Sequence, residues 1–314
     1  MGLRSGVTGG ALFGADVPLA TEQPRLGRKL SIFRVYHRLG EHFPSAQDRS
    51  LMAAGSTLLV SLDTLPGQAS YASIAAGRED GAITTFLKSV EQAAVTYHLG
   101  AIYFCFEHEA NNPTTHTGLG TPTQFVMAWD HIHQLAESAH LDWNQGGRLH
   151  WVLILTHLAY TPTAARPLWA LTAGVASDYW PGANEVDIVA ADGYNSQGCR
   201  QASGDNFIAT RPAISPDALF GPVISFAQAE GGLPVFIAEW GSTSHAPSGD
   251  QPWFIQQMQA YVTHNQEIAA ALYWNGRPPH GPCDYSINNN PASVAALATM
   301  GRAPALQGQL MQSG

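Results

Sequence analysis

Two stretches of this chain place acidic side chains directly after short apolar runs. The first reads FCFEHEANN from Phe104 to Asn112, and the second reads PVFIAEWGS from Pro234 to Ser242. Strands of a parallel sheet are covered on both faces and therefore read as continuous apolar runs. In an α/β barrel, catalytic residues lie where such strands end. Both stretches therefore predict a strand that delivers carboxyl groups to one shared site.

Two carboxyl groups that meet across such a site fit the hydrolysis of a glycosidic bond. One acts as acid/base, and the other acts as nucleophile or base. Glu239 is the single carboxyl group of its stretch, whereas Glu107 and Glu109 compete in the other. Residues two apart on a strand face the same way, so the strand pattern does not choose between these two. We predict Glu109 and Glu239 as the catalytic pair and keep Glu107 as the alternative.

A metal site is the competing interpretation of the first stretch. His108 would be the central ligand, with Glu107, Glu109 and His116 as its partners. Strand alternation turns His108 away from both glutamates, and no HExxH helical spacing is present. The chain also lacks the GxSxG, Walker and GxGxxG motifs. We therefore expect neither a metal nor a cofactor.

The rest of the chain alternates apolar strands with helical segments, which is typical of parallel βα units. We predict strands at residues 10–16, 31–36, 57–62, 101–106, 150–155, 186–190, 234–238 and 268–273. We predict helices at residues 45–54, 82–99, 122–135, 166–176, 215–229, 250–264 and 290–300. Thr121 to Gln124 resembles a capping box, and Gly100 is expected to end the helix before it.

Eight such units predict an α/β fold, a (β/α)8 TIM barrel, as a single domain over residues 1–314. A doubly wound sheet is the alternative. It would carry a glycine-rich phosphate turn after its first strand, and this chain has none there.

Aromatic and polar residues follow several of these strands. They are Phe106, Asn111, Asp192, Tyr194, Trp240 and Trp274. Aromatic rings cover the apolar face of a sugar ring, while Asn and Asp bind its hydroxyl groups. We therefore predict that these residues bind substrate, with packing at the barrel rim as the alternative.

The composition favours a neutral polar partner. Charged residues make up 12% of the chain, about half of the usual share. The net charge of −9 and the absence of Lys/Arg clusters argue against nucleic acid. No apolar run reaches the length of about 18 residues that a membrane span requires.

The three cysteines are Cys105, Cys199 and Cys283. Cys105 lies within an apolar run and is expected to be a buried thiol. Cys199 and Cys283 follow two different strands, so in a barrel both lie on the same face. We predict a disulfide between Cys199 and Cys283, which would indicate an oxidising compartment, with two free thiols as the alternative. Residues 1–14 contain no signal peptide, so the protein is either cytosolic or has lost its signal, and we expect a secreted protein.

Four motifs together resemble glycoside hydrolase family 26, a family of retaining (β/α)8 glycosidases that contains the mannanases. They are Phe106-Glu-His-Glu109-Ala-Asn111, Asp192-Gly-Tyr194-Asn, Ile237-Ala-Glu239-Trp-Gly241 and Tyr273-Trp274. The resemblance implies Glu109 as acid/base and Glu239 as nucleophile. It further implies that Tyr194 hydrogen-bonds the nucleophile, that Trp274 lies under the sugar being cleaved and that His108 lies at the same subsite.

The resemblance also implies a substrate and a mechanism. We expect an endo-β-1,4-mannanase that acts by double displacement as a monomer on a polysaccharide or oligosaccharide. β-1,3-Xylan and mixed-linkage β-glucan are the alternative substrates. Many mannanases of the family have arginine where this chain has Cys105, and they differ from it at Ala110 to Pro113. A barrel that binds carbohydrate without cleaving it, and a metal-dependent hydrolase using His108, Glu109 and Asp192, are the other hypotheses.

Overall fold

The structure is a computed structural model. It describes residues 2–65, 67–112, 118–166, 174–203, 206–210, 212–244, 250–277 and 283–311.

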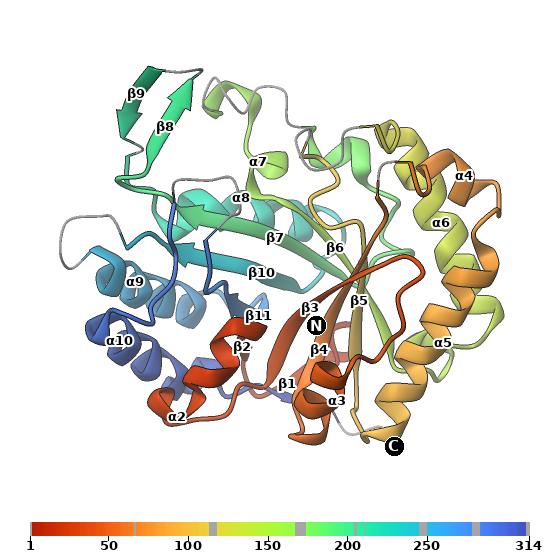
Figure 1. Cartoon of the computed structure of the whole chain (residues 1–314), viewed down its shortest axis with the longest axis horizontal. Helices are drawn as coiled ribbons and strands as arrows, with labels where there is room; N and C mark the ends of the chain where they lie inside the picture. The colour runs from red at the N-terminus through yellow and green to blue at the C-terminus, as the bar shows by residue number, and fades with distance from the viewer. Residues whose placement is uncertain are drawn as a thin grey trace.

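Eight parallel strands close into a barrel (Figure 1). They pair in sequence order, and β11 then pairs with β2 to close the ring, Ala270 lying beside Leu12. The strands are β2 (Leu12–Asp16), β3 (Ile32–Arg38), β4 (Thr57–Asp63), β5 (Ile102–Phe106), β6 (Leu149–Thr156), β7 (Ile188–Asn195), β10 (Val235–Ser242) and β11 (Ile268–Tyr273). The predicted (β/α)8 barrel and its eight strands are confirmed.

Two strands extend further than the apolar pattern indicated. β7 continues to Asn195, and β10 continues to Ser242. Asp192 and Glu239 therefore lie within paired strands instead of in loops, side by side in the register of β7 and β10. The backbone ladder fixes both residues, which gives their carboxyl groups a rigid base.

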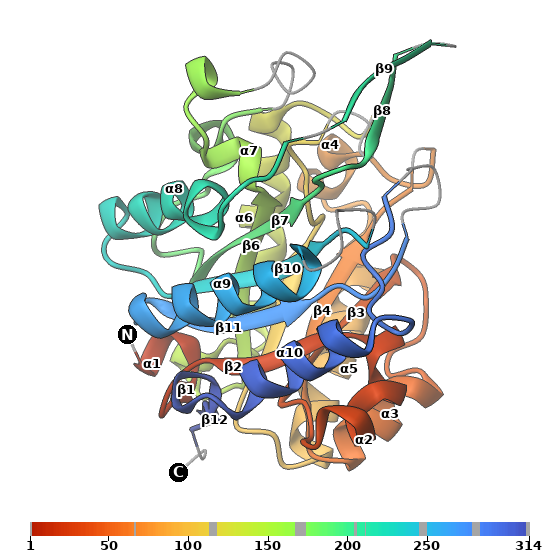
Figure 2. The same cartoon turned by 90° about the vertical axis from the view of Figure 1, so that its left-hand side faces the viewer.

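Helices surround the barrel and cover its outer face (Figures 1 and 2). The α-helices are α1 (Gly2–Ser5), α2 (Gln23–Leu26), α3 (Ala46–Ala53), α4 (Tyr71–Ala75), α5 (Asp80–Thr96), α6 (Pro122–Ser138), α7 (His157–Tyr160), α8 (Pro216–Ala229), α9 (Asp250–His264) and α10 (Pro291–Arg302). Short 3₁₀ helices are η1 (Val17–Glu22), η2 (Trp143–Gln145), η3 (Thr163–Ala165), η5 (Ala176–Tyr179) and η6 (Pro304–Leu306). No helix in the described parts of the chain is long and apolar enough to cross a membrane.

Local signals at the helix ends had mixed outcomes. The capping box is confirmed, since the side chains of Thr121 and Gln124 each accept from the backbone N–H of the other. The prediction for Gly100 was wrong. The left-handed position after α5 is taken by His98, with φ +55°, while a Cβ at Gly100 would lie 1.9 Å from the carbonyl oxygen of Met311. Most of the helix expected over residues 166–176 falls outside the described residues.

Two small sheets lie at opposite ends of the barrel. The antiparallel hairpin of β8 (Arg200–Ser203) and β9 (Asn206–Thr210) extends beyond the carboxyl ends of the strands (Figure 2). At the other end, β1 (Val7–Thr8) pairs with β12 (Gln309–Leu310). The second sheet holds the first and last described segments together, on the side away from the strand ends where the acidic residues lie.

The core has two layers because both faces of the strands are buried. Alternate strand residues, such as Ile32, Tyr103 and Phe236, fill the interior of the barrel. Their neighbours, such as Phe33 and Phe104, pack outward against the helices. Near the carboxyl ends the interior residues become polar, which is where the candidate site begins.

Candidate active site

A buried arginine lies at the centre of the barrel mouth. Arg34 occupies the middle of β3 and is fully buried. Its Nη1 lies 2.7 Å from Oδ1 of Asp192 on β7 and 3.2 Å from Oε1 of Glu239 on β10. A charge inside a barrel is tolerated when it is paired, so the guanidinium and the two carboxylates hold one another in place.

Glu239 also accepts hydrogen bonds from two tyrosines. Tyr36 donates to its Oε1, and Tyr194 donates to its Oε2. Burial raises the pKa of both phenols above the ordinary value, so both stay protonated and remain donors. Hydrogen bonds to an ionised acceptor are among the stronger ones. The three partners therefore stabilise the charge of Glu239 and fix its orientation.

Glu109 has a different environment, just beyond the end of β5. Its φ of +55° is left-handed, and its N–H donates to the carbonyl of Ile154 on β6 over 2.9 Å. Its Oε2 accepts from Nδ2 of Asn112 at 3.0 Å. Burial and the charge of Glu239 raise the pKa of Glu109, against the smaller opposing effects of His108 and Asn112. Glu109 thus keeps its proton to higher pH than an ordinary glutamate, as a general acid must.

His108 adds a positive charge beside Glu109. Its Nδ1 lies 3.0 Å from Oδ1 of Asp63 at the end of β4, and its ring lies 5.3 Å from that of Tyr36. Burial lowers the pKa of His108, but the Asp63 carboxylate more than offsets this and raises it to about 9. The imidazole is therefore a cation at neutral pH.

The structure gives Glu107 and Glu109, the two competing glutamates of the first stretch, different environments. Glu107 is fully buried, and its Oε1 accepts from the N–H of Thr64 and from the Thr64 hydroxyl, the latter at 2.6 Å. Both glutamates have left-handed φ angles, +51° and +55°, so the alternation of an extended strand no longer applies to them. Glu107 links the segment after β4 to the end of β5, and Glu109 is the carboxyl group on which the charge of Glu239 acts.

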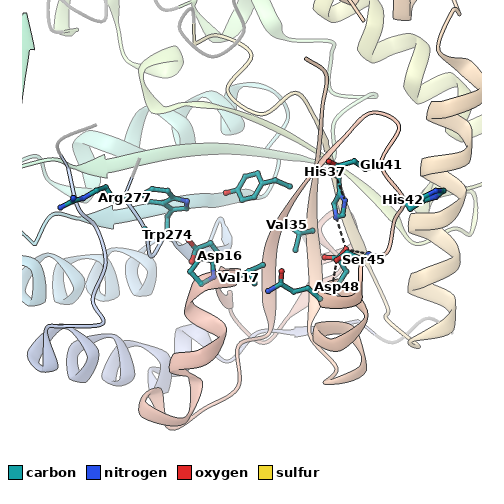
Figure 3. A pocket seen from close by; sticks show the side chains of 14 residues that line it. Asp16, Val17, Val35, His37, Glu41, His42, Ser45, Asp48, Trp274 and Arg277 are labelled. Carbon is teal, nitrogen blue, oxygen red and sulfur yellow. Dashed lines mark hydrogen bonds and ion pairs between the residues drawn. The ribbon is translucent and has the colours of Figure 1, made fainter. Parts of the chain in front are cut away.

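A groove of about 660 Å³ is lined by residues of β2 and β3 and by residues that follow β11 (Figure 3). Asp16 and Trp274 lie on one side of it, and His42 and Ser45, which lead into α3, lie on the other. Tyr36, which also lines the groove, is the donor to Glu239 and places one end of the groove at the barrel mouth. Such a volume is typical of ligand sites.

Asp16 is the buried acid of this groove. It is 4% exposed, and its Oδ2 accepts from the N–H of Asn275 at 2.9 Å. Its Oδ1 has no hydrogen-bond partner within the described residues. Burial raises the pKa of Asp16 to about 7, despite the opposing hydrogen bond from Asn275.

Cys199 and Cys283 are joined by a disulfide, which links the segment after β7 to the segment after β11. Cys105 is a buried free thiol inside the barrel.

The predicted site residues divide into two groups. His108, Glu109, Tyr194 and Glu239 lie at the barrel mouth, where the charge of Glu239 raises the pKa of Glu109 and of Tyr194. Trp274 lies at the edge of the same region, in the groove and against the ring of Tyr194.

The other predicted contacts with substrate need correction. Trp240 and Phe106 are buried in the outer layer, where Trp240 packs on Tyr273 and Phe106 packs on Phe125. Both point outward because their strand neighbours point inward. Asn111 is buried and exchanges two hydrogen bonds with Thr156, at 2.7 and 2.9 Å.

Asp192 also has a role other than the one predicted. It is 1% exposed and binds Arg34, so it acts on Glu239 through the arginine and does not reach a ligand directly.

The sequence interpretation missed Arg34, Tyr36 and Asp63. A signal was present for the first, since an arginine inside the apolar run SIFRVY must find a carboxylate once it is buried. Tyr36 then follows, because it lies two positions further along the same face. Asp63 at the end of β4 had no signal of its own.

Within the parts of the chain that the structure describes, no three His, Cys, Asp or Glu side chains are arranged to hold a metal ion. Instead His108 pairs with Asp63, and Asp192 pairs with Arg34.

No protein-family model and no curated protein matches this chain. Solved structures do match it in fold. A glycoside hydrolase family 26 β-mannanase from Bacteroides ovatus superposes with a TM-score of 0.63 at 12% identity, over 96% of this chain and 91% of that one. An endo-β-1,4-mannanase from Cellulomonas fimi gives 0.60 at 13% identity, over 96% and 73%. At these identities the likeness establishes a shared fold.

The same fold occurs in structures outside that family. A family 128 endo-β-1,3-glucanase from Sorangium cellulosum superposes with a TM-score of 0.53 at 15% identity, over 92% of this chain and 98% of that one. The barrel is thus shared with enzymes named for different glycans.

Proposed function

We propose that this protein is a retaining glycoside hydrolase. The observation that carries the proposal is the contrast between two carboxyl groups at one barrel mouth. Glu239 forms an ion pair with Arg34 and accepts hydrogen bonds from Tyr36 and Tyr194, whereas burial and the charge of Glu239 raise the pKa of Glu109. Paired carboxyl groups with such divided environments are what acid/base and nucleophile roles require.

In the proposed mechanism, Glu109 protonates the oxygen of the leaving sugar while Glu239 attacks the anomeric carbon. A covalent glycosyl–enzyme forms, and Glu109, now ionised, removes a proton from the water that releases the product. Retention requires that the two carboxyl groups lie about 5–5.5 Å apart. The cationic His108 stabilises Glu109 in the step where it carries a negative charge.

The proposed substrate is a β-linked polysaccharide, with β-1,4-mannan favoured. The family 26 resemblance of the motifs and the mannanases among the structures of the same fold support mannan. β-1,3-Xylan and mixed-linkage β-glucan are the other substrates to test. The glucanase of the same fold adds β-1,3-glucan to them.

The groove supports endo cleavage. In a retaining reaction the sugar that becomes attached to the nucleophile lies on the side away from the acid/base. The groove is lined by Tyr36, which donates a hydrogen bond to Glu239, and it continues to Gln47 in the first turn of α3. We therefore assign the groove to the sugars that precede the cleaved bond. An enzyme that releases single sugars from the chain end does not need a groove that holds several of them.

The disulfide supports a secreted protein. Structural disulfides persist in oxidising compartments, and the bond between Cys199 and Cys283 is buried. We propose that the protein acts outside the cytosol as a monomer.

The test is the hydrolysis of a polysaccharide panel containing mannan, xylan and β-glucans. Product size is followed by chromatography, and anomeric configuration by proton NMR in the first minutes. We expect one β-glycan to be cut internally with retention. Glu239→Ala should abolish turnover while leaving the protein folded, and Glu230→Ala at the end of α8 serves as the matched control with full activity.

Other outcomes point to other functions. Inversion of configuration would reject the nucleophile role of Glu239. Binding of a glycan without cleavage of any would favour the carbohydrate-binding barrel. Loss of activity in a chelator, restored by a divalent cation, would favour metal-dependent hydrolysis.

A further inference from the structure

Tyr285 lies at the contact between two residues of the candidate site. It is 4% exposed and belongs to the segment between β11 and α10. Its ring centroid lies 4.7 Å from that of Tyr194 and 5.8 Å from that of Trp274. Tyr194 donates to Glu239, and Trp274 lines the groove. The buried ring of Tyr285 therefore contacts both Tyr194, which donates to Glu239, and Trp274, which lines the groove.

Three hydrogen bonds hold Tyr285 in place, one through its hydroxyl and two through its backbone groups. The hydroxyl of Tyr285 lies 2.7 Å from that of Ser196, which immediately follows β7. Its N–H donates to the carbonyl of Gly276 at 2.9 Å, and its carbonyl accepts from the hydroxyl of Tyr273 at 2.6 Å. A buried tyrosine held at its hydroxyl and at both backbone groups has little freedom to shift.

The disulfide holds the two segments that meet here. Cys283 lies two residues before Tyr285, and Cys199 lies three residues after Ser196. The bridge closes a loop with a sequence separation of 84. Both cysteines form one small apolar cluster with Tyr285, against which Tyr194 and Trp274 pack. The covalent link therefore holds Tyr285 at the distance from β7 that its contacts require.

Gly241 accounts for how closely Tyr285 approaches the barrel. It lies two residues after Glu239 and beside Tyr194 in the register of β10 and β7. A Cβ added there would lie 3.2 Å from Cβ of Tyr285, tighter than an ordinary contact. A side chain at this position would push Tyr285 away from Tyr194.

We propose that Tyr285 is a positioning residue, held by the Cys199–Cys283 disulfide, that sets the hydroxyl of Tyr194 on Glu239 and the plane of the Trp274 ring. The inference rests on the proposed hydrolase function, because it assigns Glu239 as the nucleophile. Tyr285 itself does not touch the reacting atoms. Its effect passes through Tyr194 to the carboxylate and through Trp274 to the groove.

The kinetic test compares Tyr285→Ala with Tyr285→Phe on the glycan that the wild type cleaves. We expect Tyr285→Ala to lower kcat at least tenfold, because the hydroxyl of Tyr194 is no longer held on Glu239. Tyr285→Phe keeps the ring and should retain kcat within about threefold. Tyr261→Ala on α9 removes a partly buried ring outside the site and serves as the control.

The role of the disulfide is tested by a double-mutant cycle. Cys199→Ser with Cys283→Ser should lower kcat in the same direction as Tyr285→Ala. Combining all three changes should add little further loss, since they act through one contact. Fully multiplicative effects would show that the disulfide acts independently and would overturn its part in the proposal.

A crystal structure of Tyr285→Ala gives a readout that does not depend on activity. We expect the Tyr194 hydroxyl to leave Glu239 and the Trp274 ring to tilt. Superposition of both rings on the wild type would overturn the proposal, whether or not the wild type cleaves a glycan. The two proposals can also fail separately. If the wild type cleaves no glycan but the rings are displaced in Tyr285→Ala, the hydrolase function is rejected and the positioning role of Tyr285 is retained. Tyr285→Leu replaces the alanine variant if that variant does not fold.

Discussion

The ion pair of Asp63 and His108 permits a quantitative test of the site's electrostatics. Asp63→Asn keeps the shape of the side chain and removes the negative charge 3.0 Å from Nδ1 of His108. In the wild type that charge outweighs burial and raises the pKa of His108 to about 9. In the variant, burial and the charge of Arg34 together outweigh the smaller opposing effect of Glu239, so we expect His108 to titrate below the ordinary value of about 6.5.

The size of the effect follows from the difference between 6.5 and about 9. At about 1.4 kcal/mol for each tenfold change in proton affinity, it corresponds to roughly 3 kcal/mol. The His108 side chain is 23% exposed, and solvent screening reduces the figure to about 2–3 kcal/mol. The folded state binds this proton more tightly than the unfolded state. The stabilisation is therefore complete below pH 6.5 and is lost as the pH rises to about 9.

The assay combines proton NMR titration of the His108 ring with urea unfolding at pH 6 and pH 9.5. His108→Gln identifies the resonance. We expect the wild type to lose about 2–3 kcal/mol more than Asp63→Asn between the two pH values. Asp80→Asn is the matched control, because it breaks the more exposed pair with His131, where Nε2 lies 2.7 Å from the carboxylate. Titration of His108 near 6.5 in the wild type would refute the reasoning.

Four further outcomes are expected. Glu109→Ala should lower kcat/KM for glycans by about 10²–10⁴-fold while sparing kcat/KM for aryl glycosides with acidic phenol leaving groups, which need no protonation in the first step; equal losses of kcat/KM on both would contradict the acid role. Arg34→Met leaves Asp192 buried and unpaired, so chemical denaturation should show a loss of about 3–5 kcal/mol. Burial raises the pKa of Asp16 from 3.8 to about 7, so its contribution to stability falls across that range, and Asp16→Asn should raise the Tm at pH 8 but not at pH 3.5. Gln47→Ala should raise KM about fivefold for long oligosaccharides, as expected for one lost hydrogen bond of about 1 kcal/mol, and leave short ones unchanged.

The barrel could be predicted because each strand is buried on both faces. A run such as AIYFCF before Glu107 is apolar at every position, and this continuous pattern marks a strand without revealing which residues face inward. That ambiguity explains the errors at Phe106 and Trp240. In the structure Cys105 points into the barrel and Phe106 points outward. A run that is apolar at every position does not indicate which of its alternate residues face the interior.

The catalytic candidates Glu109 and Glu239 stood out because charges end apolar runs, whereas their partners did not. Arg34 and Tyr36 lie within a strand whose other residues are mostly apolar, and their roles depend on β7 and β10, which follow more than 150 residues later. The pairing of Asp63 with His108 depends on the close approach of two strand ends. These are tertiary distances, and a local sequence pattern does not contain them.

The closure of the ring between β11 and β2 has a consequence for biosynthesis. Leu12–Asp16 is made early, and its partner Ile268–Tyr273 is made about 250 residues later. At 5–20 residues per second the interval is about 12–50 s. Throughout it, one edge of β2 and the edge of the most recently made strand present unpaired backbone groups, which readily pair with other chains. Until β11 is made, the nascent chain is therefore an open sheet with two unpaired edge strands. Its protection from aggregation during this interval depends on the ribosome and on molecular chaperones.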